Sequence, residues 1–315
     1  MRTSIPMMSM LAAALMLAAC KPTAPQAPAQ PAPATPAAAT PAAASADSGA
    51  AKSAKPAPGD AHDNLNAVSW VQRSAEYAAV TTTIYHAATA HLDAALKSGE
   101  SALAEGEQSS GTAKLPPAVV MDVDETVLDN SPYQARLIAD GKEFEDLTWD
   151  QWVAEKKARP VPGVVEFAKA AEAKGITILY ISNRAEHLQA ATLANLRAAG
   201  LPVKNDEVFL GLGTFVEGCE QNGSEKLCRR KLAGQKYRVL MQFGDQLGDF
   251  VQILANTPQT RAELSAKYAG WWGQRWWMLP NPTYGSWEPA LFNNDWKQPQ
   301  EARRQAKRGM LNTEK

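Results

Sequence analysis

The stretch from Val119 to Leu128 constrains the fold more than any other part of the chain. It begins with Val-Val-Met, an apolar run without alternation, which predicts a strand buried on both faces, as in a parallel sheet. The strand ends in two carboxylates, Asp122 and Asp124. Ligands bind at such strand ends in open α/β sheets, and two neighbouring acids suit the place when a cation lies between them or one carries a proton. The stretch therefore predicts a site for phosphoryl transfer, with an acidic turn after an ordinary strand as the simpler alternative.

The first 60 residues predict export and a lipid anchor. Residues 1–19 have the order of a signal peptide, with Arg2 before an apolar stretch that is too short to span a bilayer. The tetrapeptide that ends in Cys20 resembles the lipobox of bacterial lipoproteins, which implies acylation of Cys20, and Lys21 behind it favours the outer membrane. An ordinary secreted protein is the alternative. Residues 20–60 consist almost wholly of Ala, Pro, Ser, Thr and Gln, a composition typical of an extended tether.

Helical and strand patterns alternate along residues 61–315. Apolar residues at helical spacing over 64–97 predict an N-terminal helical extension that stops at Gly99. An insert at about residues 131–160, polar and aromatic with one short helical pattern, is placed to cover the site as a small α-helical cap. The alternation predicts an α/β fold with a doubly wound parallel sheet in one domain. We expect helices at 164–174, 186–199 and 225–234, and further strands at 176–181, 208–210, 238–244 and 276–279.

Polar side chains follow the later strands as well. Ser182 comes directly after the second strand, and Asp245 and Asp249 follow the fourth. Lys226 stands at the start of a predicted helix. The carboxylates suit a hard divalent cation that takes oxygen ligands, most simply Mg²⁺. The Lys226 ammonium and the Ser182 hydroxyl suit the oxygens of a phosphoryl group, so a cation and a phosphoryl group are expected to meet at this edge of the sheet.

Two other kinds of partner are not expected. His86 and His91 lie five residues apart and face different sides of one helix, so they do not form a metal pair for zinc. The 32 Lys and Arg residues are balanced by 33 Asp and Glu residues, which gives no basis for binding a nucleic-acid polymer. The expected partner is a small phosphomonoester.

Four motifs, in order, resemble those of the haloacid dehalogenase-like superfamily: Asp-x-Asp-x-Thr, a serine at a strand end, a lysine before a helix, and Gly-Asp-x-x-x-Asp. Longer runs are similar to the class C acid phosphatases, which are bacterial outer-membrane lipoproteins. These runs are Asp-Glu-Thr-Val-Leu-Asp-Asn-Ser, Ile-Ser-Asn-Arg, Gly-Asp-Gln-Leu-Gly-Asp-Phe and Pro-Asn-Pro-Thr-Tyr-Gly-Ser-Trp-Glu. The likeness covers about residues 62–296 and implies a Mg²⁺-dependent acid phosphatase with a haloacid dehalogenase-like core.

The resemblance implies a role for each motif residue. Asp122 would attack phosphorus to give an aspartyl-phosphate, and Asp124 would protonate the leaving group and later activate water. Ser182 and Lys226 would bind the phosphoryl group, and the pattern Ser224-x-Lys226 favours this lysine over the three basic residues that follow. The metal ligands would be the Asp122 carboxylate, the Asp124 backbone carbonyl, Asp245 and Asp249.

The resemblance also implies how a leaving group is held. Trp149 and Tyr284, with Trp287 as a weaker candidate, occupy places where aromatic side chains of the family stack on a leaving group that is often a nucleoside. Asn183 and Arg184 complete the expected substrate contacts. Nucleoside 5′-monophosphates are therefore expected among the substrates, and simple packing is the alternative role of the aromatic residues.

Cysteine pairing and assembly complete the expectations. With Cys20 acylated, Cys219 and Cys228 remain as an even pair in an oxidising compartment, which predicts a disulfide, and two free thiols are the alternative. A homodimer is expected from the family alone. Two other functions stay open. One is a phosphotransferase or phosphomutase that uses the same intermediate. The other is a surface lipoprotein that binds a flat ligand such as heme, although no Cys or His motif supports it.

Overall fold

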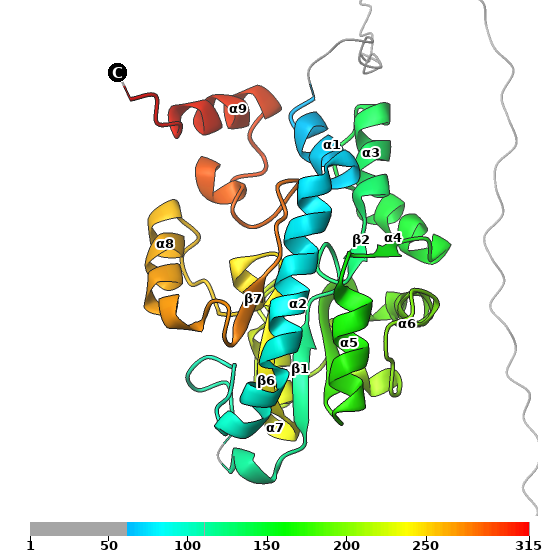
Figure 1. Ribbon diagram of the computed structural model, residues 1–315. Helices are drawn as coiled ribbons and strands as arrows, with labels where there is room; N and C mark the ends of the chain where they lie inside the picture. Colours follow the sequence, from blue (N-terminus) through cyan, green and yellow to red (C-terminus); the bar gives the residue numbers. More distant parts are fainter. Residues whose placement is uncertain (1–61, 110, 315) are drawn as a thin grey trace, which may run out of the picture. The chain divides into compact units, whose positions relative to one another are not determined.

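The computed structural model describes residues 62–109 and 111–314 (Figure 1). The predicted signal peptide, the tether and the acylation of Cys20 lie outside these residues. Among the described helices, none is both long and apolar enough to cross a membrane.

Five parallel strands form the central sheet in the order β5-β4-β1-β6-β7. All five predicted strands are present, and the α/β fold is confirmed. β1 and β6 are buried along almost their whole length, as expected for strands that are covered on both faces. Their bounds are β1 (Pro117–Met121), β4 (Thr177–Ala185), β5 (Phe209–Leu212), β6 (Arg238–Gly244) and β7 (Trp276–Met278).

The sheet changes its direction of winding between β1 and β6. From β1 the chain winds through β4 to β5, and it then returns by α7 (Leu227–Lys236) to β6 and β7 on the other side of β1. Such a switch point opens a crevice at the carboxyl ends of its two strands. Asp122 follows β1 and Asp245 follows β6, so the topology brings both to this crevice.

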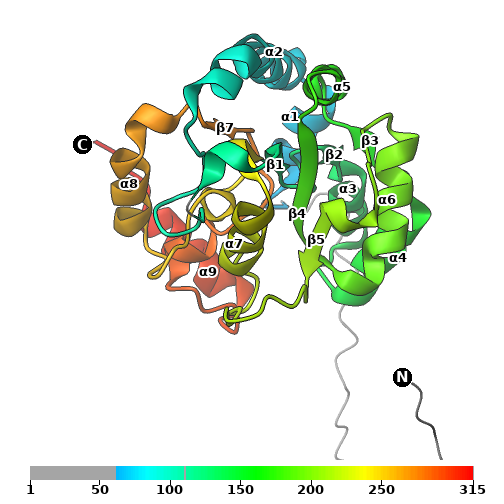
Figure 2. The same ribbon diagram turned by 90° about the horizontal axis from the view of Figure 1, so that it is seen from below.

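Helices cover both faces of the sheet (Figure 2). α2 (Ala75–Ser98) and α5 (Val164–Ala173) lie side by side on one face, and α7 lies on the other. α6 (Gln189–Ala198) packs beside β5. α7 begins two residues later than predicted, so Lys226 is its N-cap residue.

The N-terminal helical extension consists of two helices. α1 (Leu65–Arg73) ends before Ser74, whose hydroxyl accepts a hydrogen bond from the Tyr77 amide (3.0 Å) and caps the start of α2. Gly99 ends α2 as predicted, with a left-handed φ of 71°.

The extension is part of the protein core. Tyr85 of α2 is fully buried, and its ring stacks on Phe243 of β6 with ring centres 5.5 Å apart. Its hydroxyl donates to the Thr126 carbonyl (2.8 Å) in the loop after β1. The first long helix therefore supports the loop that carries the two motif carboxylates.

The cap insert is helical, as predicted, but more regular than its polar composition suggests. It contains α3 (Ser131–Asp140) and α4 (Asp146–Glu155), and β2 (Leu128–Asp129) pairs with β3 (Arg159–Pro160) at its base. The expectation of only one short helical segment is wrong: α3 forms as well, with Tyr133 and Leu137 buried one turn apart, and α4 buries Trp152 and Val153.

Two helices near the C-terminus have no counterpart in the sequence prediction. α8 (Pro258–Lys267) begins after Thr257, whose hydroxyl accepts from the Thr260 amide (3.1 Å). α9 (Gln300–Gly309) is almost wholly polar, with only Arg303 buried. Short 3₁₀ turns connect several of the other elements.

Candidate active site

The loop after β1 places Asp122 and Asp124 at the switch point of the sheet. The Asp122 amide donates to the Phe243 carbonyl of β6 (2.9 Å), so the loop starts as a continuation of the sheet. Glu125 has a positive φ of 58°, and its amide donates to the Leu128 carbonyl (2.8 Å). A tight turn thus holds both carboxylates at the end of the central strand, with Asp122 buried and Asp124 partly exposed.

Lys226 is the cation in contact with Asp122. Its ammonium donates to Asp122 Oδ1 and to Asp249 Oδ1 (2.7 Å). Arg229 and Arg230, one turn further along α7, bond to backbone carbonyls and to other side chains instead. Burial lowers the pKa of Lys226, but attraction to the two carboxylates outweighs burial, so the pKa lies above its ordinary value and the side chain stays cationic.

Three buried carboxylates form a cluster at the crevice. Asp122, Asp245 and Asp249 each offer an oxygen, and these oxygens lie within 4.8 Å of one another. Burial raises the pKa of Asp122 to about 7, even though Lys226 opposes the change. Burial and the neighbouring carboxylates raise the pKa of Asp245 well above its ordinary value. Lys226 alone does not balance the negative charge of three carboxylates. A hard divalent cation takes carboxylate oxygens as ligands, so the cluster fits such a cation.

Asp124 lies beside Ser182 and Arg184 at the end of β4. Its Oδ1 accepts a hydrogen bond from Nε of Arg184 (2.9 Å) and forms an ion pair with Nη2 (2.8 Å), while Oδ2 is 3.3 Å from the Ser182 hydroxyl. Ser182 is fully buried, and its hydroxyl also accepts from the Arg184 amide (3.0 Å). The two predicted catalytic residues are therefore in contact. Arg184 borders the cavity, but its side chain is fully buried against Asp124.

A cavity of about 1150 Å³ connects these groups with the predicted substrate contacts. Its wall includes Asp122, Asp124 and Lys226 as well as Asn183 and three aromatic candidates. Trp149 comes from α4 of the insert, and Tyr284 and Trp287 come from the loop after β7. The structure thus gathers the predicted phosphate-binding and leaving-group contacts around one cavity, with the aromatic residues Trp149, Tyr284 and Trp287 in its wall.

The loop after β7 is bonded to both acidic loops. Asn281 Nδ2 donates to Asp245 Oδ2 (2.7 Å), and the Tyr284 hydroxyl donates to Glu125 Oε2. The backbone amide of Asn130 donates to the other carboxylate oxygen of Glu125 (2.7 Å). Sequence reasoning missed Glu125, Asn130 and Asn281. The available signal was their place as polar residues inside the family-like runs, and only Glu125 also adjoins an assigned residue, Asp124.

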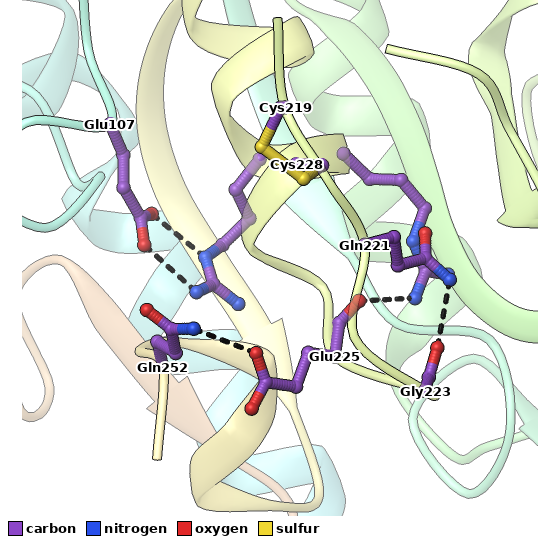
Figure 3. Close-up of a disulfide and its surroundings, with 9 residues drawn as sticks. Glu107, Cys219, Gln221, Gly223, Glu225, Cys228 and Gln252 are labelled. Carbon is purple, nitrogen blue, oxygen red and sulfur yellow. Dashed lines mark hydrogen bonds and ion pairs between the residues drawn. A yellow bond between two sulfur atoms is a disulfide. The ribbon is translucent and has the colours of Figure 1, made fainter. Parts of the chain in front are cut away.

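Cys219 and Cys228 form a disulfide, with Cα atoms 5.6 Å apart (Figure 3). Cys228 lies in the first turn of α7, two residues after Lys226. Beside the bridge, Gln252 donates to the Glu225 carboxylate (2.7 Å) and ties the start of α7 to the segment after β6. The structure therefore has the predicted pairing, and the bridge closes the loop that leads to Lys226.

Comparison with known proteins agrees with this geometry. The model of the HAD superfamily, subfamily IIIB (acid phosphatase), matches residues 34–287. The solved structure of the class C acid phosphatase from Bacillus anthracis is similar, with a TM-score of 0.69 and 32% sequence identity, and the match covers 79% of this chain and 97% of that one.

Two plant proteins are more distant relatives. Acid phosphatase 1 of Solanum lycopersicum is 24% identical over 165 residues, which are 52% of this chain and 57% of the tomato protein. The stem 28 kDa glycoprotein of Glycine max is 27% identical over 132 residues, which are 42% of this chain and 52% of the soybean protein. The chain thus spans little more than half the length of these relatives.

Replacing Glu125 by glutamine should change how stability depends on pH. Burial, with Asp124 beside it, raises the pKa of Glu125 from 4.5 to about 8, so the folded protein keeps a proton that the unfolded chain loses. The contribution of this proton to stability is full below pH 4.5 and is lost as the pH rises toward 8. We expect Glu125→Gln to be more stable than the wild type at pH 8, with the gain shrinking toward pH 5, in urea titrations that contain EDTA.

Glu166→Gln, at an exposed position of α5, is the matched control and should leave the pH dependence unchanged. A stability difference between Glu125→Gln and the wild type that stays constant from pH 5 to pH 8 would contradict the raised pKa of Glu125.

Proposed function

Because the chain belongs to subfamily IIIB of the HAD superfamily, the acid phosphatases, we propose that it hydrolyses phosphomonoesters by way of an aspartyl-phosphate on Asp122. The observation that carries the proposal is the contact between Lys226 and Asp122 inside a cluster of buried carboxylates. A carboxylate can attack a phosphoryl group only where the negative charge of that group is neutralised. The Lys226 ammonium, together with a divalent cation, supplies this neutralisation.

The reaction proceeds in two displacements. In the first, a carboxylate oxygen of Asp122 bonds to phosphorus as the ester P–O bond breaks, and Asp124 gives a proton to the departing oxygen. In the second, water attacks phosphorus, Asp124 takes a proton from that water, and the Asp122 carboxylate leaves. Ser182 and Lys226 donate hydrogen bonds to the phosphoryl oxygens throughout. One cycle consumes one water and returns Asp122 ionised and Asp124 protonated.

We infer that the bound cation is Mg²⁺, because the cluster offers carboxylate oxygens. Asp122, Asp245 and the backbone carbonyl of Asp124 would hold it, with Asp249 beside them. When bound, the cation supplies positive charge for the phosphoryl oxygens. Asn281 orients the proposed metal ligand Asp245 by donating a hydrogen bond to its carboxylate.

Nucleoside 5′-monophosphates are the proposed substrates. The cavity of about 1150 Å³ is far larger than a phosphoryl group requires, and Trp149 and Tyr284 stand in its wall. An aromatic ring stacks on every base, so such a wall favours nucleosides without selecting one base. We also propose that the domain is anchored at the outer membrane, because the lipobox-like tetrapeptide supports acylation of Cys20 and Lys21 after it favours that membrane.

The metal assignment predicts opposite effects of Asp245→Asn on stability and on activity. In EDTA at neutral pH the variant should melt at a higher temperature than the wild type, because burial and the neighbouring carboxylates raise the pKa of Asp245, so that this carboxyl costs stability at neutral pH. Millimolar Mg²⁺ should raise the Tm of the wild type by mass action and leave the Tm of the variant unchanged. Hydrolysis of p-nitrophenyl phosphate should fall at least about 100-fold in the variant, since metal stabilisation of transition-state charge contributes several kcal/mol.

Asp150→Asn is the matched control, because this aspartate of α4 is partly exposed, pairs with His187 and is not part of the carboxylate cluster. It should behave as the wild type with and without Mg²⁺. A Tm rise on adding Mg²⁺ that is as large in Asp245→Asn as in the wild type would contradict the assignment.

The stacking role of Trp149 is tested by comparing a nucleotide with its sugar phosphate. Trp149→Leu should raise KM for adenosine 5′-monophosphate about 10-fold, since stacking on one base contributes about 1–3 kcal/mol. KM for ribose 5-phosphate, which lacks the base, should not change. Trp70→Leu, in α1 and outside the cavity wall, should change neither value. Equal rises for both substrates in Trp149→Leu would assign this tryptophan to packing alone.

A further inference from the structure

We propose that the insert helix α4 positions the acid/base carboxylate of Asp124 through two buried residues, Asn130 and Arg184. The proposal rests on the acid/base role given to Asp124 above and adds the residues that orient it. Arg184, which the sequence suggests as a substrate contact, is assigned here to Asp124. Both residues are positioning residues, because each acts on the reaction through Asp124.

One oxygen of Asp124 accepts most of its hydrogen bonds. Oδ1 accepts hydrogen bonds from Asn130 Nδ2 (2.9 Å) and Arg184 Nε (2.9 Å), and Arg184 Nη2 forms an ion pair with it at 2.8 Å. Within residues 62–109 and 111–314, the one hydrogen bond to Oδ2 comes from the Ser182 hydroxyl, at 3.3 Å. Two N–H donors and the adjacent cationic Nη2 leave no room for a proton on Oδ1. The proton that Asp124 transfers therefore belongs on Oδ2, and Asn130 and Arg184 decide where Oδ2 points.

Arg184 is itself fixed by contacts from two helices. Its side chain is fully buried, and Nη1 donates to the Thr192 hydroxyl of α6 (3.3 Å). Nη2 is 3.3 Å from Asn130 Oδ1, and the guanidinium carbon lies 5.5 Å from the ring centre of Trp149 in α4. A guanidinium presents its donors in one rigid plane, so contacts that fix this plane also fix the direction of the Asp124 carboxylate.

Asn130 connects Asp124 to α4 directly. Its side-chain oxygen accepts from the indole N–H of Trp152 (2.8 Å), and its NH₂ group donates to Asp124. An indole N–H can only donate, so the Asn130 oxygen must face Trp152 and the NH₂ group must face the carboxylate. Asn130 is fully buried and Trp152 is 2% exposed, so water does not replace these bonds. The insert therefore helps to orient the Asp124 carboxylate, in addition to forming part of the cavity wall.

Loss of this orientation should matter only where the leaving oxygen needs a proton. Proton donation contributes about 10²–10⁴-fold to such reactions. A p-nitrophenolate leaves readily as an anion, whereas phenol has a pKa of about 10 and leaves better with a proton. The two phenyl esters have similar shapes, and kcat/KM reports steps up to the release of the phenol. The ratio of kcat/KM for p-nitrophenyl phosphate to that for phenyl phosphate therefore measures how well Asp124 is aimed.

The experiment compares this ratio in the wild type, Arg184→Gln and Trp152→Phe. We expect Arg184→Gln to lower kcat/KM for phenyl phosphate about 10- to 100-fold and for p-nitrophenyl phosphate less than about 5-fold. Trp152→Phe keeps an aromatic ring and removes the donor to Asn130, so it should shift the ratio in the same direction by a smaller factor. It also keeps the test valid if Arg184→Gln does not fold. Arg197→Gln, at an exposed arginine of α6, is the matched control and should leave the ratio unchanged.

Asp124→Asn serves as the reference for complete loss of the acid. One outcome is that Asp124→Asn loses kcat/KM selectively for phenyl phosphate while Arg184→Gln and Trp152→Phe keep the wild-type ratio of the two esters. That result overturns the positioning proposal, and the proposed function stands. Equal losses on both esters in the two variants would overturn it as well, because a merely structural role lowers both rates together. If Asp124→Asn itself shows no selective loss, the acid role of Asp124 fails and the positioning proposal fails with it.

Discussion

Three buried carboxylates lie with oxygens within 4.8 Å of one another at the carboxyl edge of the sheet, and among the described residues Lys226 is the one cation that bonds to two of them. Such a cluster repels itself, and it stays together only because the backbone that carries it is fixed by other interactions. The same repulsion makes the cluster a place where a cation and a phosphoryl group are stabilised. The fold therefore has to supply a rigid frame around a locally unfavourable group of charges.

Much of this frame comes from outside the sheet. Arg230 of α7 pairs with Glu107, a buried residue of the segment before β1, through two hydrogen bonds of 2.8 Å (Figure 3). Arg230 also donates to the Gly248 carbonyl (2.9 Å), next to Asp249. Tyr85 of α2 holds the loop after β1 in a similar way, through the Thr126 carbonyl. Segments before the first strand thus hold two of the loops that carry the carboxylate cluster.

The strands and the order of the carboxylates could be predicted from the sequence because both are local properties. An apolar run such as the one before Asp122 predicts a buried strand wherever it occurs, and the parallel topology then brings its end next to Asp245. The partners of Arg184 could not be predicted in this way. Its burial depends on α4 and α6, and the link from Trp152 to Asn130 joins residues 22 positions apart. Side-chain partners of this kind are set by tertiary packing, which no local pattern encodes.

Trapping the aspartyl-phosphate tests the proposed mechanism at its first step. Asp124→Asn, which lacks the base for the second displacement, would be mixed with p-nitrophenyl phosphate, quenched in acid and digested for mass spectrometry. We expect a phosphoryl group on Asp122, formed in step with the first release of p-nitrophenol. Release of p-nitrophenol with a phosphoryl group on another side chain, or with none on the protein, would contradict the proposed mechanism.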